Sequence, residues 1–201
     1  MARRRSQHEE HTVTERLKAF VAEVEAAVSA ERGEPAVLQR VVNAMRELVA
    51  HDDWLPETHA APDATHYQQH LLYRDPQGRF SVVSFVWGPG QQTPVHDHTV
   101  WGVIGMLRGQ EVSQAYALEQ GVVRETGEAE VLEPGDVAVV SPSLGDIHRV
   151  RNGLEDRVSI SIHAYGTDIG TRPRHVFDPQ THAVKTFISG YSASAPVRLA
   201  P

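Results

Sequence analysis

Apolar residues in the first fifty positions recur at helical spacing and predict two amphipathic helices. The first pattern follows a capping-box sequence at Thr12–Glu15 and ends near Gly33, and Pro35 suits the first turn of the second helix. The apolar positions are Leu17, Phe20, Val21, Val24 and Val28, and then Leu38, Val41, Val42, Met45, Leu48 and Val49. Each stripe needs an apolar surface to cover it, so we expect both helices to pack outside a downstream sheet.

From residue 67 onward the pattern changes to short segments separated by turn sequences, which is typical of β-strands. The candidate strands are residues 67–74, 79–87, 96–107, 110–118, 129–133, 137–141, 147–152, 157–165 and 183–188. Short strands at this spacing predict a mainly β fold, a jelly-roll barrel or sandwich with the N-terminal α-helices packed outside. Residues 51–66 lack periodicity and predict a loop with one helical turn.

We expect one domain overall, because 201 residues with 40% hydrophobic content suffice for a single well-cored unit. Within it, residues 1–66 form a helical segment packed on the barrel, residues 67–190 form the barrel, and residues 191–201 form an extended tail.

Charge and composition narrow the choice of partners. A formal net charge of -7 disfavours a general nucleic-acid or anionic-membrane binder. No stretch approaches the roughly 18 apolar residues that a membrane span needs, and the N-terminus lacks the apolar core of a secretory signal. The chain has no cysteine, which excludes disulfides and thiolate metal ligands. We expect a cytoplasmic protein, a monomer or weak homo-oligomer that binds neither nucleic acid nor membrane.

Two histidines one residue apart form the first candidate metal site. His96 and His98 lie in the stretch from Gly90 to Gly109, GQQTPVHDHTVWGVIGMLRG, between apolar runs. In a strand, residues i and i+2 point to the same face, so both imidazoles would project to one side. Neutral imidazole nitrogens are common ligands of transition metals. The spacing of glycines and histidines resembles the first motif of the cupin superfamily, which usually carries a glutamate where this chain has Gly102.

A second motif supplies a third histidine. The segment from Gly135 to Asn152 resembles the second cupin motif, with His148 at its histidine position and one extra residue on each side of Pro142. In that motif the histidine lies on a strand facing the first pair. The resemblance therefore implies His148 as the third ligand.

The glycine at position 102 changes the chemistry that such a site favours. Two histidines and a carboxylate are the common ligand set of non-haem iron, whereas three neutral histidines leave the charge of a divalent ion uncompensated. Anionic ligands such as a thiolate or an enolate would compensate that charge. Zinc on three histidines could also activate water. A hydrolase of that kind needs a nearby general base, and the motifs contain none.

A polar row follows on the segment 157–165, RVSISIHAY. Ser161, His163 and Tyr165 alternate with apolar residues, so the three share one face of a strand. A hydroxyl, an imidazole and a phenol in a row can form a hydrogen-bond relay beside the metal. The alternative is an outward-facing polar strand surface.

These features together resemble the cysteine dioxygenase family of thiol dioxygenases. The resemblance covers residues 67–165, and the two N-terminal helices are in keeping with it. It implies one Fe(II) per chain on the three histidines, and the addition of both atoms of O₂ to the sulfur of a small-molecule thiol to give a sulfinic acid. It also implies that Ser161, His163 and Tyr165 are the family's outer-sphere triad, with Tyr165 near substrate and oxygen.

The chain departs from the mammalian pattern at two positions. Gly102 stands where mammalian members carry a cysteine cross-linked to the triad tyrosine, so Tyr165 must be a free phenol. Gln68 stands where those enzymes use an arginine for the substrate carboxylate. In this respect the chain resembles a bacterial branch of the family with glutamine at that position, the 3-mercaptopropionate dioxygenases, in which a later arginine binds the substrate carboxylate. Arg174 is the best match for that arginine, and Arg172 is the alternative.

Since glutamine cannot form the charge-assisted fork of an arginine, a thiol acid without an amine should be tolerated, and 3-mercaptopropionate is favoured over L-cysteine. Three alternatives stay open: a cysteine dioxygenase proper, a cupin dioxygenase acting on a diketone or enol, and a non-catalytic cupin that binds a small ligand. Three histidines discriminate poorly among divalent metals, so the ion actually loaded is also open.

Overall fold

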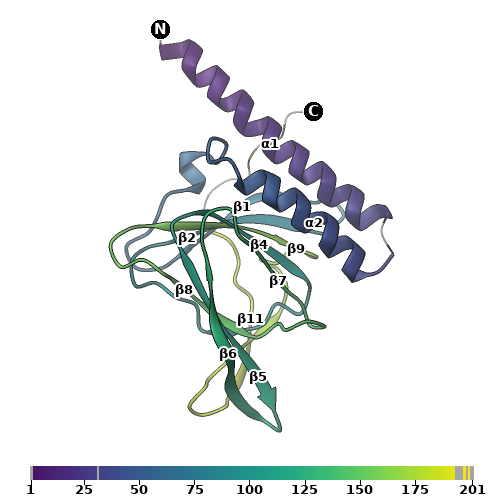
Figure 1. Cartoon of the computed structure of the whole chain (residues 1–201), viewed down its shortest axis with the longest axis vertical. Helices are drawn as coiled ribbons and strands as arrows, with labels where there is room; N and C mark the ends of the chain where they lie inside the picture. Colours follow the sequence, from purple (N-terminus) through teal and green to yellow (C-terminus); the bar gives the residue numbers. More distant parts are fainter. Residues whose placement is uncertain (1, 31, 193–196, 198, 200–201) are drawn as a thin grey trace.

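The computed structural model describes residues 2–30, 32–192, 197 and 199, with side chains from Glu15 onward. Two helices lie against one side of a two-sheet β-structure, and a long two-stranded ribbon projects from the opposite end (Figure 1). The helices cover the outer face of one sheet, so side chains of the strands and loops fill the space between the two sheets.

Helix α1 runs from Ala2 to Ala30 and helix α2 from Glu34 to Val49. The predicted boundary between them is confirmed, since Gly33 has a φ of 101° and proline stands in the first turn of α2. The capping-box prediction is wrong, because α1 continues through Thr12–Glu15 instead of beginning there. The loop that follows α2 contains the short 3₁₀ turn η1, Glu57–His59, as predicted.

The eleven strands of the described chain form two antiparallel sheets. The five-stranded sheet has the order β1-β2-β9-β4-β7, and the six-stranded sheet has the order β11-β10-β3-β8-β5-β6. Their bounds are Gln68–Arg74 (β1), Ser81–Trp87 (β2), Val95–His96 (β3), Gly102–Arg108 (β4), Glu111–Glu119 (β5), Val122–Leu132 (β6), Val137–Val140 (β7), His148–Asn152 (β8), Ser159–Tyr165 (β9), Arg174–Phe177 (β10) and Val184–Phe187 (β11). The predicted mainly β jelly-roll sandwich is confirmed.

One predicted strand, residues 96–107, is in fact two strands separated by an irregular segment. The carboxylate of Asp146 accepts hydrogen bonds from the backbone amides of His98 and Thr99, so these amides need no ladder partner. Thr99 also has a φ of 60°, which a regular strand excludes. The predicted strand at 129–133 is longer than expected, and β10 was not predicted at all.

Both helices pack on the outer face of the five-stranded sheet, as predicted. Apolar residues of α1 and α2 share one buried cluster with outward-facing residues of this sheet: Val82, Val86, Val103, Leu107, Ile160, Ile162 and Ala164. The approach is close at Gly105, where an added Cβ atom would lie 2.6 Å from Met45 Cγ. Glycine therefore lets α2 lie directly on β4.

Part of the C-terminal segment also contacts the sheet. Ser192 N–H donates to the Gln69 carbonyl, and Val197 N–H donates to the Leu72 carbonyl. The rest of the predicted tail, residues 193–196, 198, 200 and 201, lies outside the described residues. The bounds of the three predicted segments therefore stay a prediction. Among the described residues, neither helix is apolar enough along sufficient length to cross a membrane.

Candidate metal centre

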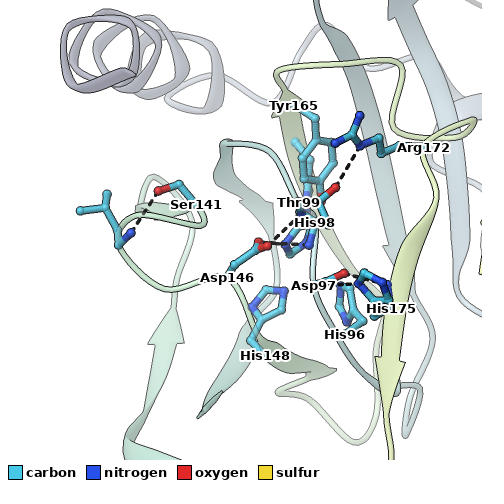
Figure 2. A network of polar contacts seen from close by, with 12 residues as sticks. His96, Asp97, His98, Thr99, Ser141, Asp146, His148, Tyr165, Arg172 and His175 are labelled. Atoms are coloured by element: carbon cyan, nitrogen blue, oxygen red, sulfur yellow. Dashed lines mark hydrogen bonds and ion pairs between the residues drawn. The ribbon is translucent and has the colours of Figure 1, made fainter. Parts of the chain in front are cut away.

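Three histidines from three separate segments converge at one point between the sheets (Figure 2). His96 ends β3 and pairs directly with His148 at the start of β8, while His98 lies in the irregular segment after β3. All three are buried, and one ring nitrogen from each lies within 4.8 Å of the others. The structure thus brings together the three histidines that the sequence indicates as metal ligands.

Hydrogen bonds orient each of the three rings through the Nδ1 atom. His96 Nδ1 lies 3.1 Å from the carbonyl oxygen of Pro94, and His98 Nδ1 lies 2.9 Å from Asp146 Oδ1. His148 Nδ1 lies 3.0 Å from Ser113 Oγ. Since a carbonyl or carboxylate only accepts, the proton of His96 and of His98 resides on Nδ1. The Nε2 atoms of these two rings are therefore free to bind a metal ion, and that of His148 is free as well when Ser113 accepts from Nδ1, which is the arrangement expected of metal-ligating histidines.

The surroundings also keep two of the three rings, His96 and His148, uncharged. Burial lowers the pKa of His96 and His148 well below the ordinary value, and the neighbouring imidazoles lower it further. Protonated imidazoles cannot bind a metal, so neutral rings at physiological pH are what a ligand set requires. The three residues thus fit a divalent ion such as Fe(II), in keeping with the predicted ligand set.

Two aspartates beside the histidines were not singled out from the sequence. Asp146 bonds His98, and hydrogen bonding to that ring holds the pKa of Asp146 below its ordinary value although burial opposes the shift. Asp97 accepts from the backbone N–H of His175 and lies 2.8 Å from its Nδ1. Their positions next to His96, His98 and the Gly145 turn were the only sequence signal for them.

Ser161, His163 and Tyr165 form a continuous hydrogen-bonded row on β9, called the β9 relay below. Ser161 Oγ lies 2.8 Å from His163 Nε2, and His163 Nδ1 lies 2.8 Å from the Tyr165 hydroxyl. All three are buried, so the alternative of an outward polar face is wrong. The Tyr165 ring stacks on His98 with the ring centroids 5.3 Å apart, which places the relay directly beside the metal centre.

Burial keeps the imidazole and the phenol of the relay neutral. It lowers the pKa of His163 well below the ordinary value, with a further contribution from His98, and it raises the pKa of Tyr165 well above 10. Neutral groups can each donate one hydrogen and accept another, so the relay can transmit a hydrogen-bond direction without becoming charged.

Gly102 makes room for the Tyr165 ring. The two residues are directly opposite each other in the β4–β9 ladder, and a Cβ atom on residue 102 would lie 2.8 Å from Tyr165 Cε1. The residue that replaces the usual cupin glutamate therefore also sets the position of the phenol.

The two candidate arginines differ in burial. Arg172 is exposed and donates from Nε to Thr99 Oγ1 over 3.0 Å. Arg174 is 4% exposed, and among the described residues it has one hydrogen-bond partner, Ser189 Oγ at 2.8 Å, and no salt bridge. Its Nε atom is buried and has no partner within the part of the chain that the structure describes. Arg174 starts β10, the strand that pairs with β3, so it stands next to the metal centre.

The structure does not bring Gln68 to this group. The Gln68 side-chain amide donates to the carbonyls of His66 and Tyr67. The next residue, Gln69, is buried, and its amide donates to Ser189 Oγ, the same hydroxyl that receives Arg174. Gln69 is also opposite Phe85, whose ring lies 4.3 Å from that of His163. Gln69 therefore faces the interior, and Gln68 faces away from it.

A comparison with known families agrees with this geometry. The family model described as cysteine dioxygenase type I matches residues 12–175, which include all three histidines and the β9 relay. The chain belongs to the cysteine dioxygenase type I family. Membership confirms the prediction of an oxidoreductase of the non-haem iron thiol dioxygenase class.

The individual relatives share less than a third of their aligned residues with this chain. Cysteine dioxygenase type 1 of Danio rerio is 29% identical over 157 residues, which cover 73% of this chain and 74% of that protein. The human protein of the same name is 28% identical over 143 residues, or 70% of each chain.

Solved structures similar to this fold include two bacterial proteins. A double-stranded β-helix protein from Klebsiella pneumoniae has a TM-score of 0.45 and 17% identity, and covers 55% of this chain and 80% of its own. A cupin-like protein from Thermotoga maritima has a TM-score of 0.43 and 17% identity, and covers 69% of this chain and 90% of its own.

Proposed function

We propose that this chain oxidises a small thiol carboxylic acid to its sulfinic acid, with 3-mercaptopropionate favoured over L-cysteine. The thiol RSH and O₂ give RSO₂H, so both oxygen atoms end on sulfur and no other reductant is consumed. One Fe(II) per chain, held by His96, His98 and His148, would supply the site at which sulfur and oxygen react. The remaining roles belong to side chains around that ion.

The observation that carries the assignment of a thiol bearing a carboxylate is the buried guanidinium of Arg174. The Arg174 guanidinium has lost its hydration, and among the described residues only the Ser189 hydroxyl and the face of the Phe187 ring replace part of it, with the Nε atom left unpartnered. A substrate carboxylate would restore those hydrogen bonds, and carboxylates suit the planar fork of an arginine. Gln69 shares Ser189 with Arg174 and would hold the guanidinium in place.

The acidic groups nearest to this position favour a substrate without an ammonium group. Asp97 and Asp146 both contribute to the electrostatic environment of Arg174. The oxygens of Asp97 already receive His175, and those of Asp146 already receive His98 and Thr99. A substrate ammonium group would therefore have to compete with these hydrogen bonds for either carboxylate. That competition favours 3-mercaptopropionate, and the hydrogen bond of Gln69 to Ser189 makes Gln69, in place of Gln68, the proposed glutamine of the site.

The β9 relay would act on the bound substrate through the Tyr165 hydroxyl. The phenol lies beside His98, and His163 fixes its orientation. A neutral phenol can donate a hydrogen bond to a substrate or to oxygen without adding charge to the site.

Oxygen consumption by anaerobically Fe(II)-loaded protein tests the proposal. We expect a higher kcat/KM for 3-mercaptopropionate than for L-cysteine, and a product carrying two added oxygen atoms. Propanethiol, which lacks the carboxylate, should be turned over poorly. Arg174→Lys should raise KM for 3-mercaptopropionate about tenfold or more, because a charge-assisted fork contributes about 1.5–3 kcal/mol. Arg172→Lys is the matched control and should behave as the parent.

Preference for L-cysteine would contradict the substrate assignment and leave the family intact. Equal effects of the Arg174 and Arg172 substitutions would contradict the carboxylate role of Arg174. Turnover of a diketone by protein inactive on thiols would favour the enol-dioxygenase alternative, and ligand binding without oxygen uptake would favour a binding protein.

A further inference from the structure

A carboxyl group is buried at the end of the β9 relay that is farther from the metal. Glu111 begins β5, and the residue is only 2% exposed. Its Oε2 atom is buried and has no hydrogen-bond partner among the described residues. A carboxyl group in such a place is costly to ionise and costly to leave unsatisfied. Neither the metal ligands nor the proposed substrate contacts account for it.

Glu111 adjoins the relay through Ser161. The Ser161 hydroxyl and the Trp87 indole are the polar side chains that act on the Glu111 carboxyl, and both lower its pKa against the effect of burial. The Trp87 indole N–H also donates to Ser161 Oγ over 3.2 Å. Glu111 thus extends the relay to four groups, from the buried carboxyl to the Tyr165 hydroxyl.

Counting hydrogens allows two arrangements of this row. A serine hydroxyl has one hydrogen and two acceptor positions, and one of these receives the Trp87 N–H. If Glu111 is ionised, it can only accept, so Ser161 donates to it and receives the Nε2–H of His163. The Nδ1 atom of His163 then bears no hydrogen and must accept the hydroxyl hydrogen of Tyr165.

If Glu111 is protonated, the order reverses. Its hydroxyl donates to Ser161, and Ser161 donates to His163 Nε2. The hydrogen of His163 then resides on Nδ1 and is donated to the Tyr165 oxygen. The phenol hydrogen is left free to point toward the substrate. Both arrangements satisfy the same heavy-atom positions, and only the positions of the hydrogens differ.

We propose that Glu111 is a positioning residue whose protonation state sets the direction of hydrogen bonding along the β9 relay. A neutral carboxyl presents Tyr165 to the substrate as a donor, and an ionised carboxyl withdraws that hydrogen toward His163. The catalytic consequence rests on the proposed function, whereas the reversal itself is a property of the protein alone.

The surroundings of Glu111 make this change accessible near neutral pH. Burial raises its pKa from 4.5 to about 7, although the hydrogen bonds of Ser161 and Trp87 lower it in part. Its cross-strand neighbours, Asn152 and Leu132, carry no charge. The titratable groups facing it along the relay are His163, which burial keeps neutral, and Tyr165, whose pKa is raised. Glu111 is therefore the group of this row that changes charge near pH 7.

The tautomer of His163 reports the direction of the relay and needs no catalysis. We would label the histidines with ¹⁵N and follow their ring nitrogens by NMR across pH. The sample would carry Zn(II), which is diamagnetic and occupies the three ligand histidines. A His163→Asn variant assigns the resonances. We expect the hydrogen to move from Nδ1 to Nε2 as pH rises through about 7, while the ring stays neutral.

Substitution separates Glu111 from other groups. Glu111→Gln removes the ionisation, so the His163 tautomer should no longer change with pH, and an amide N–H directed at Ser161 would hold the low-pH tautomer. Glu130→Gln makes the same chemical change at an exposed position of the neighbouring strand, and the His163 tautomer of that variant should change with pH as it does in the parent. A parent tautomer that is independent of pH, or one that changes identically in Glu111→Gln, would overturn the inference.

Activity adds a second readout. In iron-loaded protein, the pH profile of kcat should show an inflection near 7 that is absent from Glu111→Gln. If no variant consumed oxygen with any thiol, the proposed function would fail, and the tautomer measurement would still decide the role of Glu111. An inflection that persists unchanged in Glu111→Gln would count against the inference alone.

Discussion

Replacing the buried carboxyl of Glu111 by an amide should stabilise the folded protein relative to the parent, and this advantage should be larger at alkaline pH than at acidic pH. Glu111→Gln keeps the shape of the side chain and removes its ionisation. In the parent, the folded state must either hold a proton on Glu111 or carry a buried charge. The amide avoids both costs. The gain in unfolding free energy over the parent therefore grows as rising pH favours ionisation of the parent carboxyl.

The magnitude follows from the raised pKa. An acid with a pKa of 4.5 when unfolded and about 7 when folded keeps its proton longer in the folded state. Stability therefore falls as pH rises through this window, and the fall amounts to about 3 kcal/mol of unfolding free energy above it. The advantage of Glu111→Gln over the parent should thus grow by roughly 2 to 3 kcal/mol between pH 5 and pH 8.

Urea unfolding of the metal-free proteins at the two pH values measures this difference. Other titrating groups, including the ligand histidines, are common to parent and variant and cancel. Glu130→Gln, an exposed glutamate, should show no pH-dependent difference from the parent. An advantage of Glu111→Gln that stayed constant across pH, or that shrank as pH rose, would refute the assignment of a raised pKa to this carboxyl.

Three further substitutions test the metal centre. Gly102→Ala would bring a Cβ atom within 2.8 Å of the Tyr165 ring, so turnover should fall on the order of 10²-fold with iron content unchanged by metal analysis. Asp146→Asn removes the carboxylate that holds His98 and should weaken iron affinity roughly 10- to 100-fold in equilibrium dialysis, whereas the exposed Asp156→Asn should not. His98→Ala should lose iron retention and activity together, and full activity in that variant would contradict its role as a ligand.

Much of the centre could be predicted because its residues are close in sequence or regularly spaced. His96 and His98 are two residues apart, and the alternation of β9 alone places Ser161, His163 and Tyr165 on one face. The packing of the two helices on the sheet could be predicted as well, since their apolar stripes require a surface to cover them.

Residues whose roles depend on strand register could not be predicted in this way. Gln68 and Gln69 are adjacent, and their pairing with β2 decides which of them faces inward. Gln69 is opposite Phe85 near the relay, whereas Gln68 is opposite Val86, which belongs to the core beneath the helices. Glu111 resembles any strand-initial glutamate until its contacts with Ser161 and Trp87 are known.

The alternation of β9 also ties the chemistry of this protein to its folding. Ile160, Ile162 and Ala164 belong to the core beneath the helices, and the relay occupies the opposite face of the same seven residues. A one-residue insertion or deletion within β9 would exchange the two faces. It would send an imidazole and a phenol into the helix-packed core and isoleucines toward His96, His98 and His148. Insertions and deletions in this strand should therefore prevent folding, whereas substitutions can change the activity and keep the fold.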